Sequence, residues 1–316
     1  MNQANHVSIK TSKLTKKYGE LTAVNDLNLE IHRGEIFGFL GPNGAGKTTS
    51  ISMICGLLKP TSGKIYINGY ALDNKEQYKG IFGLCPQEII VWPKLTCLEQ
   101  LIFMGEMFGF PASRCRRAAF GLLEKLGLSE KRYKLAATLS GGMKRRLNIC
   151  LALIHDPEIV ILDEPEAGLD PQSRVMTREF IRSLKSKKTV ILTTHNMDEA
   201  ERLSDRVGIM DYGKLLLTDT PDNLKRTVGE GDVIEIAVQH KPADQMKAAT
   251  SLLKPLSIQF TVTEDSILIR KKAAIELLPE ITRILTGHGI VPGEIKMRAN
   301  TLEDVFIQLT GRRLRE

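Results

Sequence analysis

Residues 41–48 carry the feature that most constrains the fold of this chain, a glycine-rich loop with the sequence Gly-Pro-Asn-Gly-Ala-Gly-Lys-Thr. The loop matches the pattern G-x-x-x-x-G-K-[ST] and follows an apolar run, residues 35–40, that is typical of a buried strand. In such a strand–loop–helix unit the glycines let backbone N–H groups turn toward phosphate oxygens, and the helix N-terminus adds partial positive charge. The sequence therefore predicts a phosphate-binding site, in which Lys47 reaches the β- and γ-phosphates and the Thr48 hydroxyl ligates Mg²⁺.

Strands and helices alternate along the first two thirds of the chain, as the hydrophobic periodicity indicates. Apolar runs without polar alternation are typical of strands that are buried on both faces of a parallel sheet. We therefore expect an α/β fold over residues 1–225, a P-loop NTPase domain in which helices flank a largely parallel sheet. The expected strands are 7–10, 27–31, 35–40, 64–68, 159–162 and 189–193, with turns at Tyr18-Gly19 and Asn68-Gly69; the expected helices are 46–58, 98–128 with a break at Phe110-Pro111, 141–155, 173–185 and 197–204.

A polar, glycine-containing segment at residues 226–231 predicts a domain boundary. Beyond it, residues 226–316 are expected to form a small α+β domain of ferredoxin-like order, β-α-β-β-α-β, followed by a last helix. Its elements are expected at 233–239, 243–253, 257–262, 266–270, 273–287, 294–298 and 301–310. This part has no phosphate-binding or carboxylate constellation, so we expect it to be separable from the chemistry and to regulate the protein or add dimer contacts.

Composition excludes several classes of protein. Of the 316 residues, 42% are hydrophobic and 26% are charged, which is typical of globular chains and not of disordered ones. The five cysteines lack a C-x-x-C pattern, which argues against a disulfide framework or a four-cysteine zinc site and favours a reducing compartment. The first residues contain no apolar signal region, and no run approaches ~18 apolar residues, so no segment is expected to span a membrane.

The formal net charge of +7 is spread over short clusters, such as Lys144-Arg145-Arg146 and the arginines at 114, 116 and 117. Clusters of this kind usually lie on a solvated surface and only sometimes on a phosphate or nucleic-acid face. From Arg226 to the end, 13 basic residues stand against 12 acidic ones. We therefore expect no nucleic-acid partner for that part of the chain.

Two acidic residues, Asp163 and Glu164, come directly after the apolar run at 159–162. Their position places both carboxylates at the carboxyl edge of the predicted sheet, where ligands bind in open α/β folds. Asp163 is expected to hold Mg²⁺, commonly through water, and Glu164 to face the γ-phosphate and polarise the attacking water. The alternative is that the two acids cap the following helix.

The segment Leu139-Ser140-Gly141-Gly142-Met143 predicts an N-cap serine, two glycines and the start of an amphipathic helix. A helix N-terminus is itself an anion site. Taken alone, such a segment is more often only a helix start. It becomes specific because the phosphate loop and the paired acids accompany it.

With these motifs in this order, followed by Gly168-Leu169-Asp170, residues 7–225 resemble the ATP-binding subunits of ABC transporters. The resemblance implies a helical subdomain at about residues 88–150, ATP and Mg²⁺ as cofactors, and a homodimer with ATP at its interface. It further implies a separate transmembrane permease and a peripheral position on the cytoplasmic face of the membrane. The nucleotide-binding residues of the loop would be Gly41, Pro42, Asn43, Gly44, Ala45, Gly46, Lys47, Thr48 and Thr49.

The resemblance also implies roles for residues outside the loop. His195 matches the switch histidine that holds the γ-phosphate, and Gln87 matches the glutamine that reaches Mg²⁺ and water and senses the membrane partner. Tyr18 matches the aromatic residue that stacks on adenine, although a lone tyrosine at a turn is equally consistent with packing. Ser140, Gly141 and Gly142 would contact the γ-phosphate of ATP held by the partner subunit, and Asp170 would signal across the dimer.

Two further features concern the subgroup and the partner. The ending Thr301-Leu302-Glu303-Asp304-Val305-Phe306 resembles the ATPases of daunorubicin-resistance-type exporters, which act with membrane subunits of the ABC-2 class; an ordinary terminal helix is the alternative. The family often has threonine where this chain has Glu166, and the extra acid is expected to alter the dimer seam. The apolar residues at 101–104 and 107–108 would support a groove for a permease helix, although half or more of them are expected in the core.

The leading hypothesis is therefore an ATP-hydrolysing motor subunit of a membrane exporter. The second is a soluble ABC-type ATPase that acts on ribosomes or DNA, but such proteins usually carry two cassettes or a coiled-coil insertion. The third is a GTPase-type switch, which requires Asn-Lys-x-Asp; the only near match, Asn74-Lys75-Glu76-Gln77, lacks the aspartate.

Overall fold

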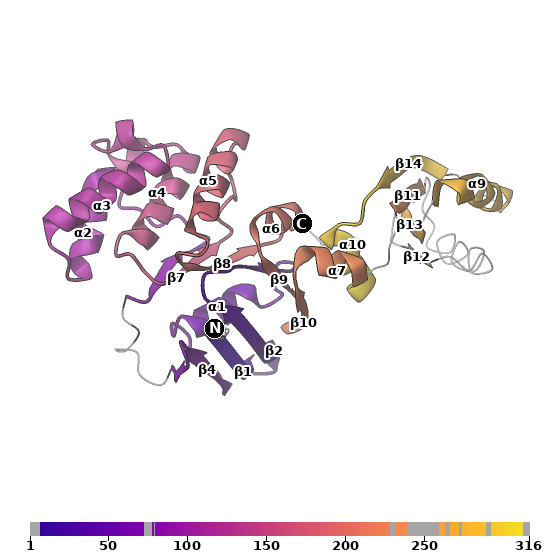
Figure 1. The fold of residues 1–316 in the computed structure, drawn as a ribbon, viewed down its shortest axis with the longest axis horizontal. Helices are drawn as coiled ribbons and strands as arrows, with labels where there is room; N and C mark the ends of the chain where they lie inside the picture. Colours follow the sequence, from indigo (N-terminus) through magenta and orange to yellow (C-terminus); the bar gives the residue numbers. More distant parts are fainter. Residues whose placement is uncertain are drawn as a thin grey trace, which may run out of the picture. The chain divides into compact units, whose positions relative to one another are not determined.

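The computed structural model describes residues 7–72, 78, 80–227, 232–238, 259–262, 266–271, 274–288 and 292–311. They form two compact units, Met1–Thr218 and Asp219–Glu316 (Figure 1). The near match to a guanine-reading motif at residues 74–77 and the helix expected at 243–253 lie outside the described residues.

A six-stranded sheet of order β10-β9-β3-β8-β7-β6 forms the centre of the first unit. The pairs β3–β8, β3–β9, β7–β8 and β6–β7 are all parallel, which confirms the expected parallel sheet. Every residue of β3 and β7 is buried, as their unbroken apolar sequences indicate. The strand bounds are β3 Ile36–Leu40, β6 Phe82–Cys85, β7 Ile159–Asp163, β8 Thr189–Thr194, β9 Arg206–Asp211 and β10 Lys214–Asp219; β6, β9 and β10 were not among the expected strands.

A second sheet of order β2-β1-β4-β5 contains the first strands of the chain. The β1 strand (Val7–Tyr18) pairs antiparallel with β2 (Leu21–His32), and Gly19 takes a left-handed φ of 57° in the turn between them. The second expected turn, at Asn68-Gly69, joins β4 (Ser62–Ile67) to the two-residue β5 (Tyr70–Ala71). Both expected turns are therefore confirmed.

The side chains of the parallel strands pack into two cores, one on each face of the sheet, because successive residues in a strand point to opposite faces. On β7, Val160 and Leu162 join a core with residues of α2, α3, α4 and α5. Ile159 and Ile161 join the other core, which contains residues of α1, β1 and β2. Helices α2, α3, α4 and α5 thus cover one face of the parallel sheet, and α1 with the antiparallel sheet covers the other (Figure 1). The helix bounds are α1 Lys47–Ile54, α2 Cys97–Met107, α3 Ala112–Lys125, α4 Gly141–Leu153, α5 Pro171–Leu184 and α6 Met197–Leu203.

Two helix boundaries depend on glycine and proline. The break expected at Phe110-Pro111 separates α2 from α3. The α1 helix, by contrast, is shorter than the expected range of 46–58, because Gly56 takes a left-handed φ of 70° just after the C-cap residue Cys55.

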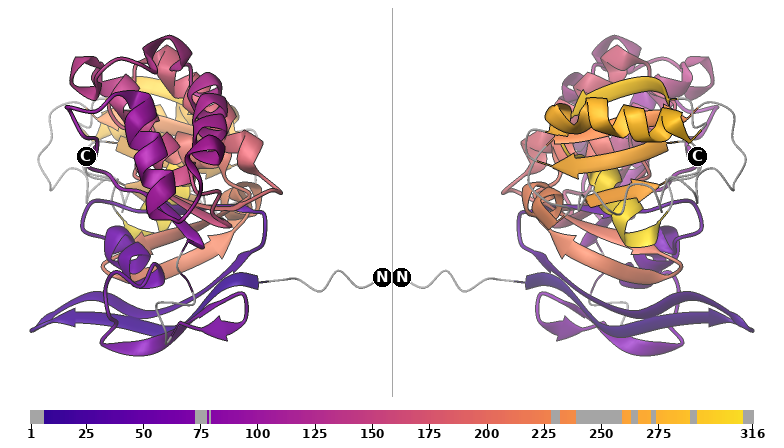
Figure 2. Two further views of the ribbon diagram at one scale, coloured as in Figure 1. Left: turned by 90° about the vertical axis from the view of Figure 1, so that its left-hand side faces the viewer. Right: turned by 90° about the vertical axis from the view of Figure 1, so that its right-hand side faces the viewer.

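The second unit contains an antiparallel sheet of order β12-β13-β11-β14, which is the strand order of a ferredoxin-like fold. The α9 helix lies against one face of this sheet (Figure 2). The terminal Thr301–Phe306 segment starts α10 with a capping box between Thr301 and Asp304, and the Asp304 carboxylate also accepts hydrogen bonds from Arg298. The bounds in this unit are α7 Pro221–Thr227, β11 Asp232–Val238, β12 Gln259–Val262, β13 Ser266–Lys271, α9 Leu278–Gly287, β14 Pro292–Arg298 and α10 Leu302–Thr310.

The five cysteines, all of them in the described part of the chain, are free thiols, and four of them are buried. Among the described helices, none has the length and apolar character that crossing a membrane requires.

Candidate functional site

The phosphate loop connects β3 to α1, as the sequence predicts. Gly46, the N-cap residue of α1, has a φ of 99°, and a Cβ atom there would come 2.5 Å from the Ala23 carbonyl oxygen. A residue with a side chain would therefore be strained and would collide with the backbone. The glycine thus lets the loop pass close to β2 and leaves the first N–H groups of α1 directed at the loop.

Lys47 is the first residue of α1, and its side chain is buried. Its Nζ atom donates hydrogen bonds to the carbonyl oxygens of Gly41 (2.6 Å) and Pro42 (3.1 Å). Burial lowers the pKa of Lys47 below its ordinary value, and the carboxylates of Glu164 and Asp163 oppose this effect. A partly desolvated ammonium at a helix N-terminus is a strong site for phosphate oxygens.

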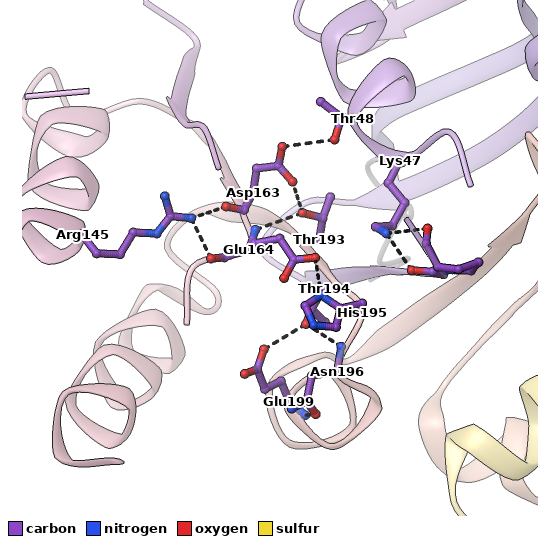
Figure 3. Close-up of polar contacts among 12 residues, drawn as sticks. Lys47, Thr48, Arg145, Asp163, Glu164, Thr193, Thr194, His195, Asn196 and Glu199 are labelled. Carbon is purple, nitrogen blue, oxygen red and sulfur yellow. Dashed lines mark hydrogen bonds and ion pairs between the residues drawn. The ribbon is translucent and has the colours of Figure 1, made fainter. Parts of the chain in front are cut away.

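Asp163 ends β7 and faces the phosphate loop. Its Oδ2 atom accepts a hydrogen bond from the Thr48 hydroxyl at 3.3 Å, and its other carboxylate oxygen accepts one from the Thr193 hydroxyl of β8 (Figure 3). The carboxylate and the Thr48 hydroxyl are therefore neighbours, although 115 positions separate the two residues. Both groups offer the oxygen ligands that Mg²⁺ prefers.

Glu164 follows Asp163 in a left-handed conformation with a φ of 53°. Its amide N–H is held by the backbone carbonyl and the hydroxyl of Thr193, both at 3.1 Å. Its carboxylate Oε1 lies 2.9 Å from Nδ1 of His195, the residue that follows β8 (Figure 3). The Glu164 side chain is 7% exposed and that of His195 is 50% exposed, so the pair has a buried and a solvent-facing member.

Lys47, Thr48, Asp163 and Glu164 line one cleft with a volume of about 710 Å³. The predicted site residues Gly41, Pro42 and His195 are not among its lining residues in the described part of the chain. Its lining includes two aromatic residues from different turns: Tyr18, which the sequence indicated, and Tyr212, which it did not. Both have substantially exposed side chains, and Lys16 lies over the Tyr18 ring at 5.1 Å. The predicted residues that line the cleft are Tyr18, Asn43, Gly44, Ala45, Gly46, Lys47, Thr48, Thr49, Gln87, Asp163 and Glu164.

The segment Leu139-Ser140-Gly141-Gly142-Met143, called the signature segment below, leads into α4, and Ser140 caps the helix by accepting a hydrogen bond from the Met143 amide at 3.2 Å. Ser140 and Gly141 are exposed. A Cβ on Gly142 would lie 3.6 Å from Oδ2 of Asp170, which itself caps α5 through the Ser173 amide. Of the residues that the structure describes, those lining the cleft do not include Ser140, Gly141, Gly142 or Asp170. The structure thus brings the signature segment and Asp170 together, apart from the cleft of the same chain.

The basic cluster at 144–146 differs from the expectation of a solvated surface. Arg145 and Arg146 are 2% and 7% exposed, because α4 is buried on all sides from Arg145 to Leu153. The Arg145 guanidinium donates to the carbonyl oxygens of Pro86 (2.6 Å) and Gln87 (2.9 Å). It also donates to the carbonyls at the end of β7 (Figure 3). This arginine was not among the site residues expected from the sequence.

Within its own chain Glu166, for which the sequence predicts an effect on the dimer seam, takes part in a buried ion pair. Its side chain is buried within the chain, and Arg178 of α5 donates to both of its carboxylate oxygens, at 2.9 and 3.2 Å. A second acid, Glu199, accepts a hydrogen bond from the Thr194 hydroxyl at 2.9 Å. Burial, followed by the charge of Glu166, raises the pKa of Glu199 to about 7. Glu166 therefore belongs to a buried polar cluster with Arg178 and Glu199.

Known sequences are similar to this chain along nearly its whole length. Residues 24–167 match the family described as ABC transporter. The linearmycin resistance ATP-binding protein LnrL of Bacillus subtilis is 37% identical over 98% of this chain and all of its own length. The Nod factor export ATP-binding protein I of Ralstonia nicotianae is 36% identical over 96% of this chain and 94% of its own length. The daunorubicin resistance ATP-binding protein DrrA3 of Streptomyces coeruleorubidus is 36% identical over 95% of this chain and 96% of its own length.

A solved structure shares the architecture. The dimeric structure of MJ0796, a bacterial ABC transporter cassette, has a TM-score of 0.62 and 29% sequence identity. The match covers 67% of this chain and 98% of that one, so it spans a complete cassette.

Proposed function

The chain belongs to the ATP-binding subunits of ABC transporters, and from this premise we propose that it binds and hydrolyses ATP to drive an exporter through a separate membrane permease. The observation that carries the proposal is the composition of the 710 Å³ cleft, which combines a phosphate loop, a buried lysine and two carboxylates. The names of its relatives support an exporter of the daunorubicin-resistance type, since they concern linearmycin and daunorubicin resistance and Nod factor export.

The cleft supports a definite set of contacts with ATP. The loop from Gly41 to Thr49 wraps the phosphates with its backbone N–H groups, and Lys47 turns its ammonium from the loop carbonyls to the β- and γ-phosphates. Tyr18 stacks on adenine at the open end of the cleft, where its ring is half exposed. Tyr212 borders the same cleft and adds a second aromatic wall.

The donor set fits Mg²⁺, because Thr48, Asp163 and Gln87 offer oxygen atoms beside the phosphate loop. The metal would neutralise charge on the phosphates. Glu164 orients and polarises the attacking water, and its buried carboxylate is held by a fixed backbone. His195, 2.9 Å from that carboxylate, has an exposed ring, and we propose that this ring contacts the γ-phosphate.

The complete site requires two chains. Ser140, Gly141 and Gly142 are free to contact a nucleotide held by a second copy, because they lie at the start of α4 and not in the cleft of their own chain. Asp170 lies next to them and is placed to signal across the seam. This arrangement supports a head-to-tail homodimer with ATP at the interface, in which each site combines one phosphate loop with the signature segment of the partner.

The helical part of the first unit supports a contact with the permease. Ile89 and Ile90, which follow Gln87, are exposed, and so are Phe103 and Met107 of α2, whereas Leu101 is buried. An exposed apolar surface next to Gln87 suits a cytoplasmic helix of a membrane subunit. The chain would thus be held at the cytoplasmic face of the membrane. Residues 226–316 would act as an accessory domain that regulates the motor or adds dimer contacts.

The purified chain, without its permease, tests the proposal. A site completed by a partner predicts slow ATP hydrolysis whose specific activity rises with protein concentration and depends on Mg²⁺. Co-purification with the product of a neighbouring membrane-protein gene would support transport over the soluble alternative. Absence of ATP hydrolysis at every concentration, with or without that membrane protein, would overturn the proposed function.

A further inference from the structure

Arg145 is the most deeply buried charged residue of α4, at 2% exposure. Within the described residues, its guanidinium donates hydrogen bonds to four main-chain carbonyl oxygens. One terminal nitrogen donates to Pro86 O at 2.6 Å and Gln87 O at 2.9 Å. The other donates to Glu164 O at 2.7 Å and to Asp163 O. One side chain therefore holds two segments that are more than 70 positions apart in the chain.

Those segments follow the neighbouring parallel strands β6 and β7, which are paired up to Cys85 and Leu162. The pairing of β6 with β7 ends there, so the carbonyl groups of the following residues need hydrogen-bond donors from elsewhere. A guanidinium suits this position, because its rigid fork presents several N–H donors in one plane and can bridge both strands. A lysine ammonium has a single donor centre and cannot reach four carbonyls with the same geometry.

Hydrogen bonds hold both the amide and the carbonyl group of Glu164. Its amide N–H donates to Thr193, and its carbonyl oxygen accepts from Arg145. The residue also has a left-handed φ of 53°, a conformation that requires support from its surroundings. The carboxylate that approaches His195 thus projects from a backbone that Arg145 helps to hold (Figure 3).

From this geometry we infer that Arg145 is a positioning residue for ATP hydrolysis. It acts through the main chain of Gln87 and Glu164, and it is not among the described residues that line the nucleotide cleft. Because Arg145 lies on the helix that Ser140 caps, it also ties the signature segment to the hydrolytic groups of the same subunit. The inference rests on the proposed function, and it predicts that Arg145 is needed for turnover but not for ATP binding.

Arg146 provides a matched control. It is the next residue on α4 and is also buried, at 7% exposure, but its guanidinium donates to Leu126 O at 2.7 Å and contacts Met176 Sδ at 3.3 Å. These partners belong to the helical packing and do not line the cleft. A change of Arg146 therefore measures the general cost of altering a buried arginine in this helix.

The test compares wild type, Arg145→Lys, Arg145→Met and Arg146→Lys in ATP titrations, steady-state hydrolysis and thermal unfolding. We expect Arg145→Lys to lower kcat about tenfold and Arg145→Met by the order of 10²-fold, with KM and the Kd for ATP within about twofold of wild type. Arg146→Lys should keep kcat within about twofold even where its unfolding temperature falls. In a Glu164→Gln background, Arg145→Lys should still form the ATP-bound dimer.

The possible outcomes distinguish failure of this inference from failure of the proposed function. A wild-type chain that fails to hydrolyse ATP would contradict the proposed function, whereas hydrolysis by wild type and an unchanged kcat in Arg145→Lys would contradict the inference alone. Equal losses of kcat in Arg145→Lys and Arg146→Lys, or a parallel loss of ATP affinity, would show a merely structural role. Should Arg145→Met not fold, Arg145→Lys carries the test, because it retains the charge and most of the side-chain length.

Discussion

Oε1 of Glu164 lies 2.9 Å from Nδ1 of His195, although the two residues follow different strands. The contact exists because β7 and β8 are parallel neighbours whose carboxyl ends meet at one edge of the sheet. It joins a buried carboxylate to an exposed imidazole, the two groups that we propose polarise the attacking water and contact the γ-phosphate.

The first prediction concerns Glu164→Gln. The amide keeps the shape of the side chain but removes the charge that polarises water, so ATP should bind while kcat falls by about 10²-fold or more. The variant should accumulate as an ATP-bound dimer in size-exclusion chromatography. Hydrolysis at the wild-type rate would show that Glu164 is not the base.

The second prediction concerns His195→Ala. Removal of the imidazole should lower kcat by about 10²-fold while the Kd for ATP changes little, because the phosphate loop supplies most of the affinity. Asn196→Ala is a suitable control, because Asn196 caps α6 through the Glu199 amide at 3.1 Å. This control should lose about 1 kcal/mol of stability but retain hydrolysis. Equal losses of kcat in both variants would show that the effect comes from damage to the segment between β8 and α6 and not from loss of the imidazole.

The third prediction concerns Lys47→Ala. The variant loses the buried cation that faces the phosphates, so ATP affinity should fall by about 10²-fold or more in a calorimetric titration. Lys64→Ala, at an exposed position of β4, should leave the affinity unchanged. Undiminished affinity in Lys47→Ala would contradict the assignment of the phosphate loop.

The fourth prediction concerns pH and the cluster of Glu199, Glu166 and Arg178. Because the pKa of Glu199 is raised to about 7, the folded chain holds a proton there that the unfolded chain has already released. The free energy of unfolding should therefore decrease as the pH rises from the ordinary glutamate pKa through about 7. Thermal unfolding at pH 6 and pH 8 measures this change. Glu199→Gln should reduce the difference between the two values, and an unaltered difference would contradict the assignment.

Local sequence predicts those parts of the site that one segment builds. The phosphate loop, Lys47 and Thr48 are of this kind, because strand, turn and helix are consecutive. The burial of Arg145 could not be predicted from its basic neighbours, since its acceptors come from residues 86–87 and 163–164. In the sequence Arg145 lies on the side of the helix opposite the apolar residues Met143, Leu147 and Cys150, so helical periodicity predicts an exposed side chain there.

In the fold, too, local sequence predicts some elements, whereas others depend on residues distant in the chain. The strands β3, β7 and β8 are evident from the apolar runs in their sequences, whereas β6 has only four residues and was not expected. Its assignment depends on pairing with β7, which lies more than 70 positions away. The inward turn of Glu166 likewise depends on Arg178, a residue of the following helix.

The central claim, that each site needs two chains, is tested most directly by mixing two inactive variants. Ser140→Arg places a bulky side chain at the seam, and Lys47→Ala removes the phosphate-binding cation. Thermal unfolding should first show that Ser140→Arg is folded, since loss of the helix cap costs about 0.5–2 kcal/mol.

In a head-to-tail pair of the two variants, one site carries both defects and the other carries neither. Each variant alone should be nearly inactive. An equal mixture should recover up to about a quarter of wild-type ATPase activity, because half of randomly paired dimers are mixed and each has one intact site. No recovery on mixing, together with a wild-type specific activity that does not depend on protein concentration, would contradict the account and indicate a site complete within one chain.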